Sequence, residues 1–165
     1  MYYMNRVTLL FIALLYLGVG AVNAQESSIT ESDLQLSPEL IELLRSEMRA
    51  LLSGIQLLPV GIATADWKSV ADTSAQITRS YILEQKLTPA QKKELNTSLP
   101  EHFERLDAHF HLEAKKLEAA ALNHDAQLSA FHYYRLIETC TACHRLYAPS
   151  RFPGFSSAKK HAHEH

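Results

Sequence analysis

Apolar residues that recur every three or four positions constrain the fold of this 165-residue chain more than any other feature. In the first such stretch, Ser37 is a candidate N-cap and Pro38 suits the first helical position. The apolar line that follows consists of Leu40, Leu44, Met48, Leu51, Ile55, Leu58 and Ile62. This spacing places the line on one face of an α-helix, and Pro59 predicts a kink near the last turn of that helix.

Three further stretches repeat the pattern. A second helix is predicted from Trp67 to about Gln85, after the candidate N-cap Asp66. Pro100 opens a third helix, and a fourth lies between Asp125 and Pro149. The predicted inward-facing residues of the second and third helices are Trp67, Val70, Ser74, Ile77 and Tyr81, then Phe103, Leu106, Phe110, Ala114, Leu117 and Ala121.

The connections predict how these helices are arranged. Thr88, Pro89 and Gln91 have the pattern of a capping box, which predicts a short helix to about Thr97 within a long connection. Asn123 suits a helix stop and leaves only a tight turn before the fourth helix. No stretch shows a convincing two-residue alternation of β-branched residues. The sequence therefore predicts an all-α fold, an antiparallel four-helix bundle over residues 37–149.

The N-terminal 24 residues have the layout of a secretory signal peptide. Arg6 is followed by an apolar run from Val7 to Val22, and the run closes on small residues up to Ala24. The alternative is an uncleaved membrane anchor, but the run is short for a spanning helix and ends in a plausible cleavage site. Residues 25–36 are polar and predict a flexible leader. The sequence thus predicts export, to the periplasm.

The net charge argues against a nucleic-acid-binding protein, and the predicted export argues against free cysteine thiols. Removal of Arg6 with the signal peptide leaves 15 Lys and Arg against 18 Asp and Glu, a formal charge of -3. That balance argues against a nucleic-acid partner, because it offers no cationic surface for a row of phosphates. An oxidising compartment also makes it improbable that the two cysteines remain free thiols.

Both cysteines lie in "ETCTACHRLY", where Cys140, Cys143 and His144 form a C-x-x-C-H motif. This motif supplies two thiols for the vinyl groups of haem c and an imidazole for its iron. A thioredoxin-type pair would instead stand after a strand at a helix N-terminus, whereas this pair lies at the far end of a helix. A zinc site needs four ligands, and no second ligand pair is nearby. A chance occurrence is the remaining alternative.

The fourth helix carries this motif on its predicted inner stripe. The stripe has spacings of three and four and consists of Ala130, Tyr133, Ile137, Cys140, His144 and Tyr147. The same face would therefore hold a C-terminal haem-attachment motif and continue as bundle core.

The combination of signal peptide, four-helix bundle and a single C-x-x-C-H near the end of the fourth helix resembles the cytochrome c-prime group, the class II cytochromes c. The resemblance covers about Pro38 to Tyr147, and the motif is its only sharp element. It implies that His144 is the proximal iron ligand and that a residue early in the first helix meets the opposite face of the haem. In an antiparallel bundle that residue is Met48, the only methionine after the signal peptide.

Two states of the iron follow from this resemblance. With Met48 bound, His/Met ligation raises the redox potential and favours electron transfer. With Met48 as a plain core residue, the iron is five-coordinate behind Leu44, Leu51 or Leu52 and binds NO or CO.

Other residues are secondary candidates. Arg45 is predicted to bind a haem propionate, as family relatives use an arginine near this place, and Arg49, Arg145 and Arg151 are either further partners or solvated surface charges. Candidate haem-lining or core residues are Phe110, Tyr133, Ile137 and Tyr147. A second axial histidine would come from His102, His109, His111, His124 and His132.

The tail of residues 150–165 ends in alternating histidines, His161, His163 and His165. It is predicted to be a disordered polar segment or a weak metal scavenger. Its "RFPGF" motif offers two aromatic rings that could fold back over the bundle end or a haem edge.

The functional prediction is an exported monohaem c-type cytochrome, a non-enzymatic carrier of one electron between redox partner proteins of the periplasm. One alternative is a gas-binding haem protein. The other is a haemless helical adaptor with a Cys140–Cys143 disulfide. The resemblance also allows a homodimer.

Overall fold

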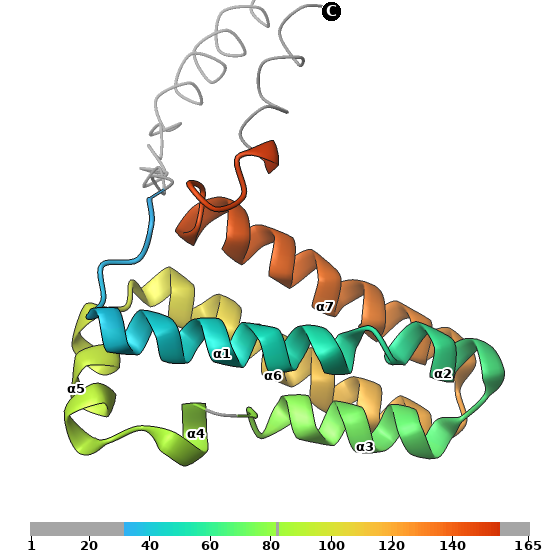
Figure 1. Cartoon of the computed structure of the whole chain (residues 1–165). Helices are drawn as coiled ribbons and strands as arrows, with labels where there is room; N and C mark the ends of the chain where they lie inside the picture. Colours follow the sequence, from blue (N-terminus) through green and yellow to red (C-terminus); the bar gives the residue numbers. More distant parts are fainter. Residues whose placement is uncertain (1–31, 82, 156–165) are drawn as a thin grey trace, which may run out of the picture.

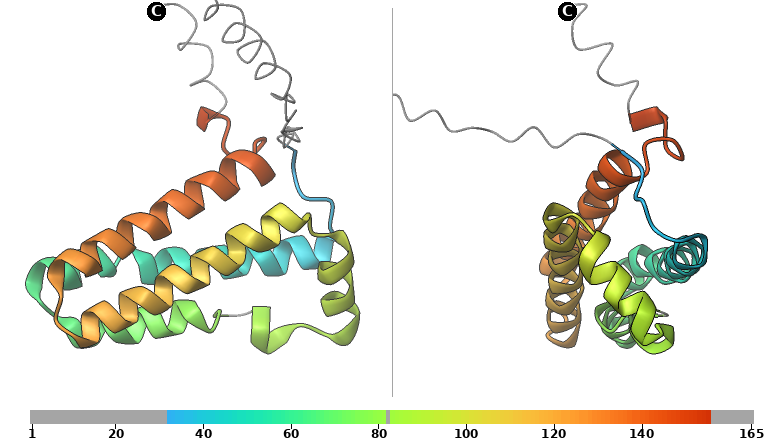
Figure 2. Two further views of the ribbon diagram at one scale, coloured as in Figure 1. Left: turned by 180° about the vertical axis from the view of Figure 1, so that it is seen from behind. Right: turned by 90° about the vertical axis from the view of Figure 1, so that its left-hand side faces the viewer.

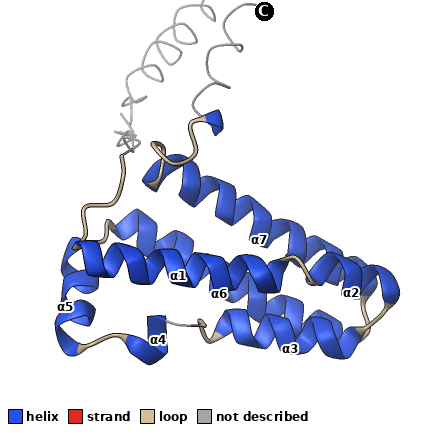
Figure 3. Ribbon diagram, in the orientation of Figure 1, coloured by secondary structure: helices blue, strands red, loops and turns tan. Residues whose placement is uncertain are grey.

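Helices form most of the described chain, residues 32–81 and 83–155 of a computed structural model, and no strand occurs in this part (Figures 1 and 3). The helices are α1 (Pro38–Ile55), α2 (Leu58–Thr64), α3 (Trp67–Thr78), α4 (Leu83–Lys86), α5 (Pro89–Ser98), α6 (Glu101–Leu122) and α7 (Ala126–Tyr147). The prediction of an all-α fold is confirmed.

Helices α1, α3, α6 and α7 all contribute residues to one apolar core. Helix α6 packs along both α3 and α7, while α1 contacts α2, α3 and α4. Figures 1 and 2 show that α7 diverges from α1 towards the C-terminal end of α7. The core consists of Leu51, Ile55, Leu58, Val70, Ala71, Ile77, Phe110, Ala114, Leu117, Ala121 and Leu136.

The first predicted helix is interrupted rather than kinked. Helix α1 ends at Ile55, and α2 begins at Leu58 with Pro59 in its first turn. Pro59 has no amide hydrogen, and its ring would clash with the carbonyl of Ile55 four residues earlier. The apolar line continues across the break, so Leu58 is still fully buried.

The second predicted helix ends earlier than its sequence pattern suggested. Helix α3 stops at Thr78, and Ser80 adopts a left-handed conformation with a φ of 59°. The carboxylate of Glu47 in α1 accepts hydrogen bonds from the Ser80 hydroxyl (2.9 Å) and from the amides of Tyr81 (2.8 Å) and Leu83 (3.1 Å). These contacts satisfy amides that a continuous helix would have bonded internally.

Most predicted helix ends are confirmed. Thr88 and Gln91 form the capping box of α5, and the carboxylates of Asp66 and Asp125 accept amide hydrogen bonds at the starts of α3 and α7. Ser37 precedes α1 but makes no side-chain cap. Its hydroxyl instead donates to Glu94 of α5 (2.9 Å).

The predicted signal peptide lies outside the described residues. Of the predicted leader, residues 32–36 are described, and they run along the end of α7. The amides of Ser32 and Leu34 donate to the carbonyls of Leu146 (2.9 Å) and Tyr147 (3.2 Å). This part of the leader therefore has a defined place against α7. Among the described helices, none combines the length and apolar character needed to span a bilayer.

A buried ionic group joins α6 to α7. The carboxylate of Glu113, only 2% exposed, accepts hydrogen bonds from Lys116 (2.7 Å) and from His132 on α7 (2.7 Å). Burial raises the pKa of Glu113, but the hydrogen bonds from Lys116 and His132 outweigh burial and leave the pKa below its ordinary value of 4.5. The ionised form of Glu113 therefore stabilises the folded state.

Substitution Glu113→Gln is expected to lower the free energy of unfolding by about 1–3 kcal/mol at pH 7, because a buried charged acceptor is lost. The stabilisation by Glu113 is complete above pH 4.5 and disappears as the pH falls through the lower folded pKa. The difference between wild type and variant should accordingly shrink in urea unfolding at pH 3. The exposed Glu104, replaced by glutamine, is the control, and an equal difference at both pH values would contradict the assignment.

Candidate functional site

Cys140, Cys143 and His144 lie in the last two turns of α7, which continues without interruption to Tyr147. All three side chains are half-buried, and both cysteines are unbridged. Cys140 packs against the edge of the core. The helix ends here because Pro149 follows and Ala148 leaves the helical conformation. The motif therefore stands on a rigid helix rather than in a loop.

The surroundings keep the thiols and the imidazole neutral. Burial raises the pKa of Cys140 to about 11. Burial, with the neighbouring groups Cys140 and Asp107, raises the pKa of Cys143 to about 12. Burial, helped by the charge of Arg151, lowers the pKa of His144. Neutral imidazole is the form that binds a metal, whereas neutral thiols are poor nucleophiles in disulfide exchange.

The helix also separates the two sulfur-bearing carbons. Residues three apart in an α-helix have Cβ atoms about 5–6 Å apart. A disulfide needs Cβ atoms about 3.5–4.5 Å apart. Because Cys140 and Cys143 both lie within α7, a bond between them would require the helix to distort.

Met48 is not buried, which corrects its predicted place in the inner seam of α1. Its side chain is 40% exposed, whereas the preceding residue, Glu47, is 2% exposed. Successive residues on a helix point about 100° apart, so the contacts of Glu47 with the end of α3 turn Met48 away from the core. The inner line of α1 actually runs through Leu40, Glu47, Leu51 and Ile55.

An apolar line beside that inner line remains uncovered. Met48 is flanked one turn away by half-buried Leu44 and by Leu52, which is 56% exposed. Leu51 belongs to the core instead, so it is not available to shield a group bound between α1 and α7. Of the three leucines predicted for that role, the structure leaves Leu44 and Leu52.

On α7 too, most residues of the predicted inner stripe lie beside the buried face of the helix. Tyr133, Ile137, Cys140 and His144 are half-buried, and Ala130 is exposed; Tyr147 alone is buried. The buried positions on α7 are Ser129, Leu136, Thr139, Leu146 and Tyr147. The stripe that carries the motif thus lies beside the core and not at its centre.

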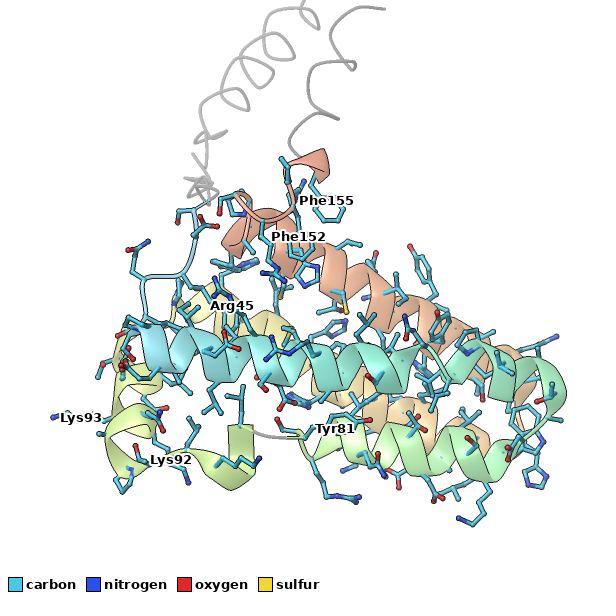
Figure 4. All side chains as sticks on the ribbon, in the orientation of Figure 1. Arg45, Tyr81, Lys92, Lys93, Phe152 and Phe155 are labelled. Carbon is cyan, nitrogen blue, oxygen red and sulfur yellow. The ribbon has the colours of Figure 1, made fainter. Side chains whose placement is uncertain are left out.

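Arg45 lies on the side of α1 nearest the C-terminal end of α7 in the view of Figure 4. Its guanidinium is 3.7 Å from the carboxylate of Glu42, which also binds Arg49 at 2.9 Å. Arg145 is exposed, and the guanidinium of Arg151 lies 6.0 Å from the ring centre of Phe152. Arg45 is therefore an exposed cation that forms a surface ion pair with Glu42.

Aromatic side chains surround the end of α7. The hydroxyl of Tyr147 lies 3.0 Å from Nδ1 of His102, and Phe103 meets the Tyr147 ring edge-on. Phe110 is in the core. Sequence reasoning did not assign Phe152, whose ring stacks on the imidazole of His144 (centroids 4.2 Å apart, 12° between planes). The aromatic pair in "RFPGF" was the available signal, and its predicted fold-back is confirmed.

The other described histidines are engaged elsewhere. Three of them form hydrogen bonds with neighbouring groups: His102 with the Tyr147 hydroxyl, His109 with Arg135 (3.2 Å) and His111 with the Ile77 carbonyl (2.9 Å). The ring of His124 stacks on Trp67. His132 is hydrogen-bonded to the carboxylate of Glu113. Across residues 32–81 and 83–155, no three Cys, His, Asp or Glu side chains gather as a metal site. The tail histidines lie outside the described residues.

The arrangement thus presents two thiols and an imidazole on one helix, and α1 carries a separate apolar line that is uncovered. Comparison with protein-family models, characterised proteins and solved structures finds no match for this chain.

Proposed function

We propose that the chain is an exported c-type cytochrome that carries one electron between redox partners in the periplasm. Cys140 and Cys143 would hold a single haem through thioether bonds, and His144 would bind its iron. When bound, the haem supplies an iron centre that accepts and releases one electron. The observation that carries the proposal is the donor set itself: two neutral thiols and a neutral imidazole at C-x-x-C-H spacing on uninterrupted α7.

The uncovered apolar line of α1 supports this assignment. Large apolar side chains such as Leu52 and Met48 are costly to leave in water, and a flat apolar group between α1 and α7 would cover them. The donors would hold the haem from α7, and the apolar line of α1 would cover part of its surface. As the finer fold, we infer an antiparallel four-helix bundle of α1, α3, α6 and α7.

Met48 and Arg45 take the remaining roles. Met48 would supply a thioether ligand to the iron, and Arg45 would neutralise a haem propionate. Met48 is 40% exposed, so its thioether is not enclosed by the core and would be accessible to a bound group.

Gas binding is the second candidate function. The observation that favours it is the position of Leu44 and Leu52 on the same line as Met48. These leucines could shield an open iron position for NO or CO if Met48 does not bind. A disulfide adaptor is the weakest candidate, because the helical separation of Cys140 and Cys143 opposes their bond.

The test is expression of the full chain together with a haem c maturation system, followed by intact mass and absorption spectroscopy. The expected result is a mass increase of one haem that survives denaturation, with a Soret band. The Cys140→Ser/Cys143→Ser variant is the control and should carry no covalent haem. A wild-type protein with the mass of the bare polypeptide would refute the proposed function.

A further inference from the structure

The segment after α7 folds back along the helix end. Pro149 ends the helix, and the amides of Arg151 and Phe152 both donate to the carbonyl of Ala148 (3.1 Å each). The amide of Ser150 donates to the carboxylate of Asp33 in the leader (3.3 Å). These bonds turn the chain so that Phe152 returns to the motif.

Residues 32–34 of the leader also hold this turn in place through hydrogen bonds. The backbone of Ser32 and Leu34 is hydrogen-bonded to the last two residues of α7, next to the contact between Asp33 and Ser150. Figure 1 shows the leader rising beside the end of α7. Two segments far apart in the sequence thus hold the turn at residues 148–152 in place.

The turn places one aromatic ring flat against His144. The rings of Phe152 and His144 are nearly parallel, with centroids 4.2 Å apart. Phe155 supports Phe152 at 6.3 Å, and Arg151 lies over the Phe152 ring. Figure 4 shows Phe152 and Phe155 together above the C-terminal end of α7. The imidazole can therefore rotate about its Cβ–Cγ bond only by displacing Phe152.

The orientation of the His144 imidazole is not set by a hydrogen bond among the described residues. Within the described part of the chain, neither nitrogen of His144 forms a hydrogen bond, and the ring contact with Phe152 is its main partner. Metal-binding imidazoles are usually oriented by a hydrogen bond from the second ring nitrogen. Here the stacked ring takes the place of that bond.

We propose that Phe152 is a positioning residue that sets the plane of the His144 imidazole and so its orientation as an axial ligand. This inference rests on the proposed haem attachment. The side chain of Phe152 has no donor atom that could bind iron. It acts through His144, and the orientation of an axial imidazole is one of the features by which a protein adjusts a bound haem.

The first test compares three variants of the haem-loaded protein by electron paramagnetic resonance of the oxidised iron. Phe152→Leu keeps an apolar side chain but removes the flat ring, and it should change the g-value anisotropy. Phe152→Tyr retains the ring and should reproduce the wild-type spectrum. Phe155→Leu is the matched control and should also match wild type. A Phe152→Leu spectrum identical to that of wild type would overturn the inference while leaving haem attachment intact.

A second test needs no haem. In the Cys140→Ser/Cys143→Ser protein, the stacked ring of Phe152 should shift the ring-proton signals of His144 upfield in the NMR spectrum. The upfield shift should disappear with Phe152→Leu and persist with Phe152→Tyr. Unshifted His144 signals would show that the stack does not form, and would overturn the inference independently of the proposed function. Failure of the wild type to attach haem would instead overturn the proposed function and the axial role together.

Discussion

In the proposed haem-loaded protein, Met48→Ala is expected to abolish the far-red methionine-to-iron absorption band of the oxidised state and to lower the midpoint potential by on the order of 0.1 V. Axial ligation by His and Met raises the haem potential, and axial ligands together adjust it over a range of about 0.8 V. Removal of the thioether should therefore cause a large loss. Optical spectra of both oxidation states and a potentiometric titration measure the effect.

The structure indicates why Met48 and not a neighbour should show this effect. Met48 is the only methionine among the described residues, and it lies on the uncovered line of α1. Alanine keeps the helix intact, because alanine has the highest helix propensity. The change therefore removes the thioether with little disturbance of α1.

Leu52→Ala is the matched control for Met48→Ala. Leu52 lies one helical turn further along the same line and is also exposed, but it has no donor atom. Its replacement should leave the far-red band and the potential nearly unchanged. If Met48→Ala also leaves the spectrum unchanged, Met48 is not a ligand. A wild-type high-spin spectrum that responds to CO would then establish the gas-binding alternative.

Glu47→Leu is expected to lower the free energy of unfolding by about 3 kcal/mol or more. Hydrogen bonds to a charged group contribute about 1.5–3 kcal/mol each, and buried donors left without partners add a further cost. Glu47 accepts from Ser80, Tyr81 and Leu83 at the junction between α3 and α4. Urea unfolding at neutral pH measures the loss.

Two further variants show whether the stability lost in Glu47→Leu comes from the hydrogen bonds of Glu47. Glu47→Gln retains one acceptor oxygen and should lose less stability, about 1–3 kcal/mol. Glu42→Gln, on the exposed face of α1, should lose little, since exposed ion pairs contribute weakly. Equal effects for Glu47→Leu and Glu42→Gln would show that the Glu47 contacts do not stabilise the fold.

The contrast between Glu47 and Met48 shows where sequence reasoning failed. The pattern placed Met48 on the inner line because apolar residues were assumed to mark the buried face. A glutamate at the neighbouring position carried no apolar signal, although its spacing of seven from Leu40 and four from Leu51 is also helical. The partners that justify its burial lie more than thirty residues away, at Ser80 and Tyr81. No local pattern reveals them.

The predicted helix ends were right where the capping contacts are local in sequence and wrong at the end of α3, where the contacts come from another helix. The capping residues Thr88, Asp66 and Asp125 bond to amides within three residues, so their local sequence was sufficient. The end of α3 was missed because its amides bond to Glu47 on another helix. The break before Pro59 was underestimated as a kink, although its cause is local.

The sequence by itself determined the all-α class, most of the helix ends and the grouping of Cys140, Cys143 and His144 on one helix, because each depends on contacts within a few residues. Only the tertiary structure decided which faces are buried, since the rotation of α1 depends on the distant partners of Glu47. It likewise decided that Phe152 covers His144, because bonds between the leader and the turn after α7 hold that ring in place.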